Sequence, residues 1–175
     1  MHRDIARLLC CLLGLAGLTA PIAGFSDEPP EIHVYKLASC GCCRPWIKYM
    51  ESEGFRIQAT DVTDVQPFKR EQGVPQEYAA CHTATVDGYV LEGHVSAEEV
   101  RRLLKERPPI KGLLVPGMPK GAPGMEGPDA VAYDVLALNA DGTVTTYGSH
   151  APPAAAEPAT PAVTPAAESP LPNPP

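Results

Sequence analysis

The sequence predicts an α/β fold with a mixed sheet, flanking helices and a C-terminal extension made of a loop and a hairpin. Three observations support this class. A β-rich run, a helical pattern and a second β-rich run follow one another within about 30 residues, the length of a βαβ unit. Asp87-Gly88 separates two further β-rich runs, as in a two-residue hairpin. Ser96 then opens a capping box, which predicts a helix directly after the hairpin.

The βαβ unit accounts for the first part of the predicted domain. Residues 32–37 are rich in β-forming side chains and form the first predicted strand. Residues 43–53 have a helical pattern, which Gly54 ends. Residues 55–60 alternate apolar and polar side chains, as expected for a second strand parallel to the first.

The next elements complete the predicted sheet. Asp64 is expected to cap a short helix that closes at Gly73-Val74-Pro75. The hairpin strands follow at residues 83–86 and 89–92, and the capping-box helix runs from Ser96 to about Arg107. The predicted order is therefore β, α, β, α, β, β, α.

An extension is predicted from about residue 108. It contains two Pro-Gly-Met units, which place Met118 and Met125 on turn-forming backbone. Residues 132–138 and 143–147 then form a final hairpin. Methionine is a soft ligand that suits Cu(I), but it also fills gaps between packed side chains, and both roles stay open for each of the two.

The two ends of the chain are predicted to lie outside the domain. Residues 1–24 have a basic start and an apolar stretch that is shorter than the roughly 20 residues of a membrane-spanning helix, as in an export signal. We expect cleavage and no stable membrane insertion afterwards, with an uncleaved anchor as the alternative. Residues 151–175 are a Pro/Ala-rich tail that is expected to be disordered. The folded domain is then residues 31–150.

The net charge of the chain and the compartment implied by export reduce the number of function classes to consider. The formal net charge of −7 makes nucleic acid an unfavourable partner. Export leads to an oxidising compartment, most simply the periplasm of a Gram-negative bacterium, where idle thiols tend to form disulfides. Clustered thiols in such a compartment imply a partner, a metal or a redox cycle.

The junction of the first predicted strand and helix carries such a cluster. Cys40 and Cys43 have the C-x-x-C spacing of thiol oxidoreductases and metal sites, and Cys42 adds a third sulfur. The helix N-terminus and Arg44 favour the thiolate, which is both the nucleophile and the soft-metal ligand. These three cysteines are the redox candidates. A structural alternative is two disulfides that also use Cys81, although adjacent Cys42 and Cys43 bridge poorly to each other.

The order of elements, with C-x-x-C at the first strand-to-helix junction, resembles the thioredoxin fold. In that fold the residues before the third strand lie beside the cysteine pair, so the resemblance implies that Cys81 and His82 approach the C-x-C-C motif. The chain departs from thioredoxins in two ways. It lacks the tryptophan before the first cysteine, and His82 stands where a cis-proline would precede the strand. Both departures favour metal binding over a general dithiol enzyme.

Four motifs occur together in the predicted domain: Cys-Gly-Cys-Cys at 40–43, Cys81-His82-Thr83, Glu92-Gly93-His94-Val95, and Val115-Pro116-Gly117-Met118-Pro119. Together they resemble the CopG-type periplasmic copper-resistance family, which is distinct from the ribbon-helix-helix repressor of the same name. The resemblance extends from Ile32 to about Tyr147. It implies a thioredoxin-like domain with a Cys-bridged copper site and a role in interconverting Cu(I) and Cu(II) for detoxification.

Two histidines are candidate ligands. His82 could instead form hydrogen bonds at the start of its strand, and His94 could be a capping or surface residue. His33 and His150 are expected to be structural or exposed.

We therefore expect a periplasmic protein that binds one or more copper ions, as Cu(I) or Cu(II), through these residues: Cys40, Cys42, Cys43, Cys81, His82, His94, Met118 and Met125. Periplasmic copper chaperones or efflux components are the expected protein partners, and a copper oxidoreductase activity is one form that the function could take. Two alternatives stay open. One is a thiol–disulfide oxidoreductase in which Cys40 attacks and Cys43 resolves, and the other is a structural zinc-binding domain.

Overall fold

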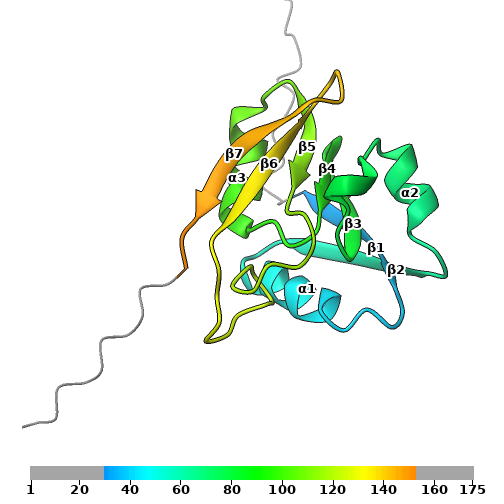
Figure 1. Ribbon diagram of the computed structural model, residues 1–175. Coiled ribbons are helices and arrows are strands. Elements are labelled where there is room, and N and C mark those ends of the chain that lie inside the picture. Colours follow the sequence, from blue (N-terminus) through cyan, green and yellow to red (C-terminus); the bar gives the residue numbers. More distant parts are fainter. Residues whose placement is uncertain (1–29, 153–175) are drawn as a thin grey trace, which may run out of the picture.

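The structure is a computed structural model that describes residues 30–152. The predicted leader at residues 1–24 and residues 153–175 of the predicted tail lie outside the described residues. One mixed sheet of seven strands runs through the described part in the order β2-β1-β3-β4-β5-β6-β7 (Figure 1). The predicted α/β class with a mixed sheet is confirmed.

The βαβ unit forms as predicted. It consists of β1 (Glu31–Leu37), α1 (Cys43–Ser52) and β2 (Arg56–Val62), and the two strands pair in parallel. On α1, Trp46 and Met50 are four residues apart and both are buried, so one face of the helix packs against the sheet. This packing places the N-terminal end of α1, where the cysteines lie, at the end of β1.

The next elements follow the expected order: α2 (Gln66–Glu71), a single 3-10 turn at Gln76–Tyr78, β3 (His82–Val86) and β4 (Tyr89–Glu92). Both residues of the Asp87-Gly88 turn have positive φ, 49° and 87°, as a tight hairpin turn of this kind requires. β3 pairs antiparallel with β1 as well as with β4. The resulting order β2-β1-β3-β4 is compatible with the thioredoxin-like arrangement.

The capping box at the start of α3 (Ala97–Glu106) is also confirmed. The Glu99 amide donates to Ser96 Oγ, and the Ser96 amide donates to the Glu99 carboxylate. The helix ends at Arg107, which adopts the left-handed conformation with φ 49°.

The C-terminal extension enlarges the sheet. β5 (Ile110–Leu114) pairs in parallel with β4, and the hairpin of β6 (Tyr133–Asn139) and β7 (Val144–His150) continues from it. The sequence does not predict β5 as a strand. Its parallel partner β4 is separated from it in the chain by α3, so no turn signal marks the pairing. In the part of the chain from 30 to 152, none of the helices is long and apolar enough to cross a membrane.

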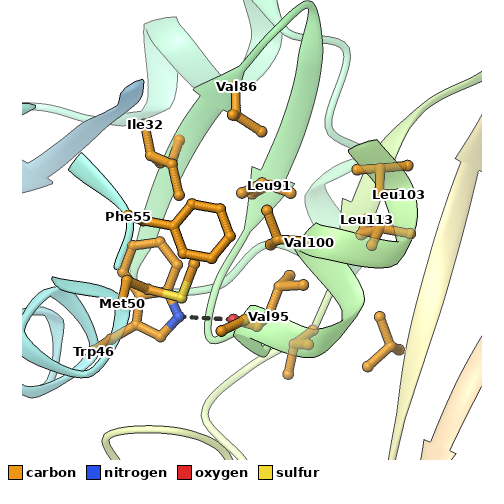
Figure 2. Packing of buried hydrophobic residues seen from close by; sticks show 14 of the residues in the cluster. Ile32, Trp46, Met50, Phe55, Val86, Leu91, Val95, Val100, Leu103 and Leu113 are labelled. Carbon is orange, nitrogen blue, oxygen red and sulfur yellow. Dashed lines mark hydrogen bonds between the residues drawn. The ribbon is translucent and has the colours of Figure 1, made fainter. Parts of the chain in front are cut away.

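The two faces of the sheet differ. The main core lies on the face that α1 and α3 cover, where Trp46, Met50, Phe55, Leu91 and Val100 pack together (Figure 2). Burial of one large apolar side chain contributes about 1.5–3 kcal/mol. The Trp46 Nε1–H also donates to the Val95 carbonyl at 2.9 Å. These contacts hold α1 against the segment that follows β4.

The opposite face carries α2. Tyr35 of β1 stacks on Phe68 of α2 with ring centroids 3.8 Å apart, whereas its neighbour Val34 belongs to the main core. Successive residues of a strand point to opposite faces. Helices therefore lie on both faces of the sheet, α1 and α3 on one and α2 on the other, and the candidate site lies beside the start of β3 and the end of β4.

Candidate metal centre

The C-x-C-C motif lies in the turn between β1 and α1. The Cys40 amide donates to the Leu37 carbonyl at 2.9 Å, and α1 begins at Cys43. Cys40 and Cys43 form a disulfide with their Cα atoms 5.5 Å apart, while Cys42 and Cys81 keep free thiols. The alternative of two disulfides is therefore wrong for this structure. The other two sulfurs remain available.

Cys42 connects the motif to the first Pro-Gly-Met unit. Its Sγ lies 3.6 Å from Cys40 Sγ and 3.5 Å from Met118 Sδ. The backbone of this unit is fixed because Gly117, with φ 67°, forms an isolated β-bridge with Ala80. The Met118 side chain is 54% exposed. An accessible thioether is thus held beside the thiols by a fixed backbone.

Cys81 lies between two imidazoles. Its Sγ is 3.3 Å from Nδ1 of His82 and 3.2 Å from Nε2 of His94. His82 opens β3 and His94 follows β4, and the Gly93 amide donates to the His82 carbonyl at 3.0 Å. The hairpin therefore brings its two ends together. Both histidines are buried, so a surface position for His94 is wrong.

Gly93 allows this close approach. It has φ 72°, and a Cβ at this position would lie 2.5 Å from the Val115 carbonyl oxygen and 2.7 Å from Cβ of Ala80. A side chain would therefore push apart the three segments that surround the cluster.

The second Pro-Gly-Met unit orients His94. Nδ1 of His94 lies 2.7 Å from the Pro123 carbonyl oxygen, which can only accept a hydrogen bond. Nδ1 therefore carries the hydrogen, and Nε2 presents its lone pair to Cys81. The backbone of Gly124 packs directly against α1, because a Cβ at this position would lie 2.6 Å from the Trp46 amide nitrogen. The unit contributes a carbonyl that fixes the imidazole.

Burial shifts the pKa values of all three groups. Burial, with smaller contributions from His94 and two lysines, lowers the pKa of His82, and burial also lowers the pKa of His94. Both rings are therefore neutral at neutral pH. Burial, and next the hydrogen bond with Cys42, raise the pKa of Cys81 to about 12. Cys81 is a thiol in the metal-free protein, and a metal must displace its proton.

The donor atoms form two groups, and within each group all the atoms lie within 4.8 Å of one another. The first consists of the sulfurs of Cys40, Cys42, Cys43 and Cys81, and the second of Cys81, His82 and His94. Thiolates and neutral imidazoles are the donors that copper prefers, with sulfur selecting Cu(I). Nε2 of His82 is buried without a hydrogen-bond partner, so the protein does not satisfy every polar atom of the cluster. The donor set fits copper.

Met125, His33 and His150 lie in other surroundings. Met125 lines a surface pocket together with Lys120 and Glu126, and in the part of the chain that the structure describes the sulfur contact with a cysteine comes from Met118. His33 and His150 each pair with a glutamate, in accordance with their expected structural or surface roles.

A buried polar network that the sequence does not predict lies behind the site. Lys69 and Glu92 form an ion pair, and both bind Thr83. The one signal for it is that Glu92 ends the apolar run of β4, where an unpaired carboxylate would be costly.

The chain is similar to known proteins over most of this region. Residues 78–125 match the family model described as a protein of unknown function, DUF411. Two solved structures of the copper resistance protein CopG, Form 1 and Form 2, share 40% identity with the chain at a TM-score of 0.67. They cover 71% and 70% of this chain, respectively, and the matched region is 99% of each of them. No match is found among curated proteins.

Proposed function

The chain belongs to the CopG family of copper resistance proteins, and from this premise we propose that it binds copper at the cysteine cluster and its two histidines. One observation carries the proposal. The sulfurs of four cysteines lie within 4.8 Å of one another, and Cys81 also belongs to a group with His82 and His94. Thiolates can bridge metal ions, so a small number of sulfurs could hold more than one copper ion.

The residues have distinct roles in this proposal. The four cysteines would supply thiolates, His82 and His94 neutral nitrogens, and Met118 an accessible thioether beside Cys42. Cys40 and Cys43 offer no thiolate while they are bridged. A two-electron, two-proton reduction of this disulfide therefore comes before binding by all four sulfurs.

We also propose that the site interconverts Cu(I) and Cu(II). A set of sulfur and nitrogen donors suits both oxidation states better than sulfur alone. Each conversion moves one electron, which is exchanged with an external redox partner. The proposed location is the periplasm, where copper chaperones or efflux components would deliver and remove the metal.

A thiol–disulfide oxidoreductase is the second candidate. The Cys40–Cys43 disulfide favours it, because this is the oxidised form of a C-x-x-C pair at a helix N-terminus. In this mechanism an external thiolate attacks one sulfur of the disulfide, a mixed disulfide forms, and the other cysteine leaves as a thiolate.

Elemental analysis and an absorption spectrum of the protein isolated from its native compartment test the proposal. Copper is expected, with strong visible absorption if Cu(II)–thiolate bonds are present. Zinc or no metal, together with failure to retain Cu(I) against a competing chelator, would refute copper binding. Zinc alone would support the structural zinc site.

A single substitution separates copper binding from dithiol chemistry. Cys42→Ser removes a proposed ligand but leaves the Cys40–Cys43 pair intact. We expect this variant to lose copper retention while its disulfide still forms. An unchanged copper content, with insulin reduction by the metal-free protein that depends on an added reductant, would favour the oxidoreductase.

A further inference from the structure

The buried ion pair behind the metal centre has no assigned role. Lys69 of α2 and Glu92 of β4 are 2% and 0% exposed. The Lys69 ammonium also donates to Thr83 Oγ1 at 2.9 Å, and the Thr83 hydroxyl donates to Glu92 Oε2 at 2.6 Å. Thr83 and Glu92 face each other directly on β3 and β4. The two charges are thus paired and bound to the start of β3.

Glu92 also reaches the segment that carries the ligands. Its Oε1 accepts a hydrogen bond of 2.6 Å from the amide of Ala80, the residue before Cys81. Ala80 in turn forms the isolated β-bridge with Gly117, the residue before Met118. One carboxylate oxygen of Glu92 therefore fixes the backbone of Ala80 and, through the β-bridge, that of Gly117. Cys81 and Met118 are the residues that follow these two.

The main chain of Glu92 adds a second constraint. Its carbonyl accepts from the Val115 amide at 2.9 Å, and Val115 leads into the first Pro-Gly-Met unit. The side chain and the backbone of one residue thus hold both ends of the segment between β5 and Met118.

The strand geometry explains why this pair can act on the site without entering it. His82 and Thr83 are neighbours on β3 and point to opposite faces of the sheet. His82 packs on Trp46 of α1 with ring centroids 4.4 Å apart, while Thr83 binds Lys69 of α2. The ion pair therefore lies under the metal centre, on the other face of the sheet.

We infer that Glu92, which Lys69 and Thr83 hold in place, is a positioning residue of the metal centre and sets the places of Cys81 and Met118 through the Ala80 amide. The inference rests on the proposed copper binding. A buried ion pair is seldom more stable than well-packed apolar residues of the same volume, because both charges lose their hydration. Its effect is therefore expected on the geometry of the ligands.

Two matched double variants test this inference. Lys69→Met/Glu92→Gln removes both charges but keeps an oxygen that can accept from the Ala80 amide. Lys69→Met/Glu92→Leu removes the charges and the acceptor. We expect the Gln variant to retain Cu(I) within about threefold of wild type, and the Leu variant to bind at least tenfold more weakly, in the range seen for residues that orient metal ligands. Urea unfolding is measured on both, and similar midpoints are expected.

A second readout uses the reduced, metal-free protein. Amide NMR shifts and hydrogen exchange of Ala80 and Cys81 are expected to change in the Leu variant and to stay close to wild type in the Gln variant. Equal copper affinity and equal amide shifts in all three proteins would overturn the inference. The inference would also be overturned if copper binding weakened equally in both variants and in proportion to their loss of stability, because this would mean a purely structural role.

The two readouts also separate this inference from the proposed function. If wild-type protein retains no Cu(I), copper binding is refuted, and the amide data alone decide whether Glu92 positions Cys81. If wild type retains Cu(I) and the Leu variant does so equally well, copper binding stands and the positioning role falls.

Discussion

Sγ of Cys81 lies 3.2 Å from Nε2 of His94, although 13 positions separate the two residues in the chain. Cys81 is the member that the four-sulfur group and the Cys-His-His group share. This contact is therefore where the sulfur and nitrogen donors of the proposed copper site meet.

Substitution of His94 tests the nitrogen side of this contact. His94→Asn can keep the hydrogen bond to the Pro123 carbonyl but has no atom in place of Nε2. We expect at least tenfold weaker copper retention, about 1.4 kcal/mol, measured by competition with a chelator. His33→Asn changes a partly exposed histidine outside the cluster and should bind as wild type. Equal retention by the two variants would exclude His94 as a ligand.

The two Pro-Gly-Met units provide their own control. Met118 contacts Cys42, whereas Met125 lines a surface pocket. Met→Leu nearly conserves volume and removes the thioether. We expect Met118→Leu to weaken Cu(I) retention by roughly tenfold, or ~1.4 kcal/mol, and Met125→Leu to change it little. A larger effect at Met125 would show that this sulfur reaches the metal.

Gly124 tests the packing of the second unit on α1. A Cβ there would lie 2.6 Å from the Trp46 amide nitrogen, and its φ of 79° is unfavourable for alanine. We expect Gly124→Ala to lower the free energy of unfolding by about 1–3 kcal/mol and to weaken copper binding, because the Pro123 carbonyl moves away from His94. Gly127 has open space around it, so Gly127→Ala is the matched control. Urea unfolding that gives equal stabilities would contradict this packing.

The buried histidines predict how the stability of the metal-free protein depends on pH. The folded-state pKa of His82 is below the ordinary value of 6.5, because burial disfavours the charged ring. Above pH 6.5 neither state binds the proton and stability is full. Below it the unfolded chain binds a proton that the folded protein does not. Stability therefore falls with decreasing pH, by at most ~1.4 kcal/mol per pH unit for each such histidine.

Urea unfolding at pH 7.5 and 5.5 measures this dependence. We expect lower stability at pH 5.5 and a smaller difference in His82→Phe, which can keep the packing on Trp46. His33→Asn should retain the wild-type difference. A wild-type stability that does not change between the two pH values would contradict neutral, buried histidines.

Local signals explain why much of the fold could be predicted. The Asp87-Gly88 turn, the Ser96 capping box and Gly54 after α1 act within a few residues, and each lies where the sequence placed it. β5 could not be predicted in this way. It is a strand because it pairs with β4, and a pairing between distant segments has no local signature.

The sequence predicts which residues form the candidate metal site better than it predicts how they are arranged in space. The resemblance to the thioredoxin order predicts the Cys81-His82 pair near the C-x-C-C motif, and the structure brings these residues together. Sequence could not distinguish Met118 from Met125, since both follow Pro-Gly. It also gave no role to Lys69 and Glu92, because two opposite charges become a buried pair only when α2 packs over the sheet.

Copper competition on the reduced protein tests the central claim most directly. Wild type and a Cys42→Ser/Cys81→Ser variant are reduced, loaded with Cu(I) and titrated with a chelator of known affinity. The proposed site predicts that wild type retains copper at chelator concentrations that strip the variant, and that oxidation of Cys40 and Cys43 to the disulfide weakens retention in wild type. Equal loss of copper from wild type and the variant would contradict a copper site at these sulfurs.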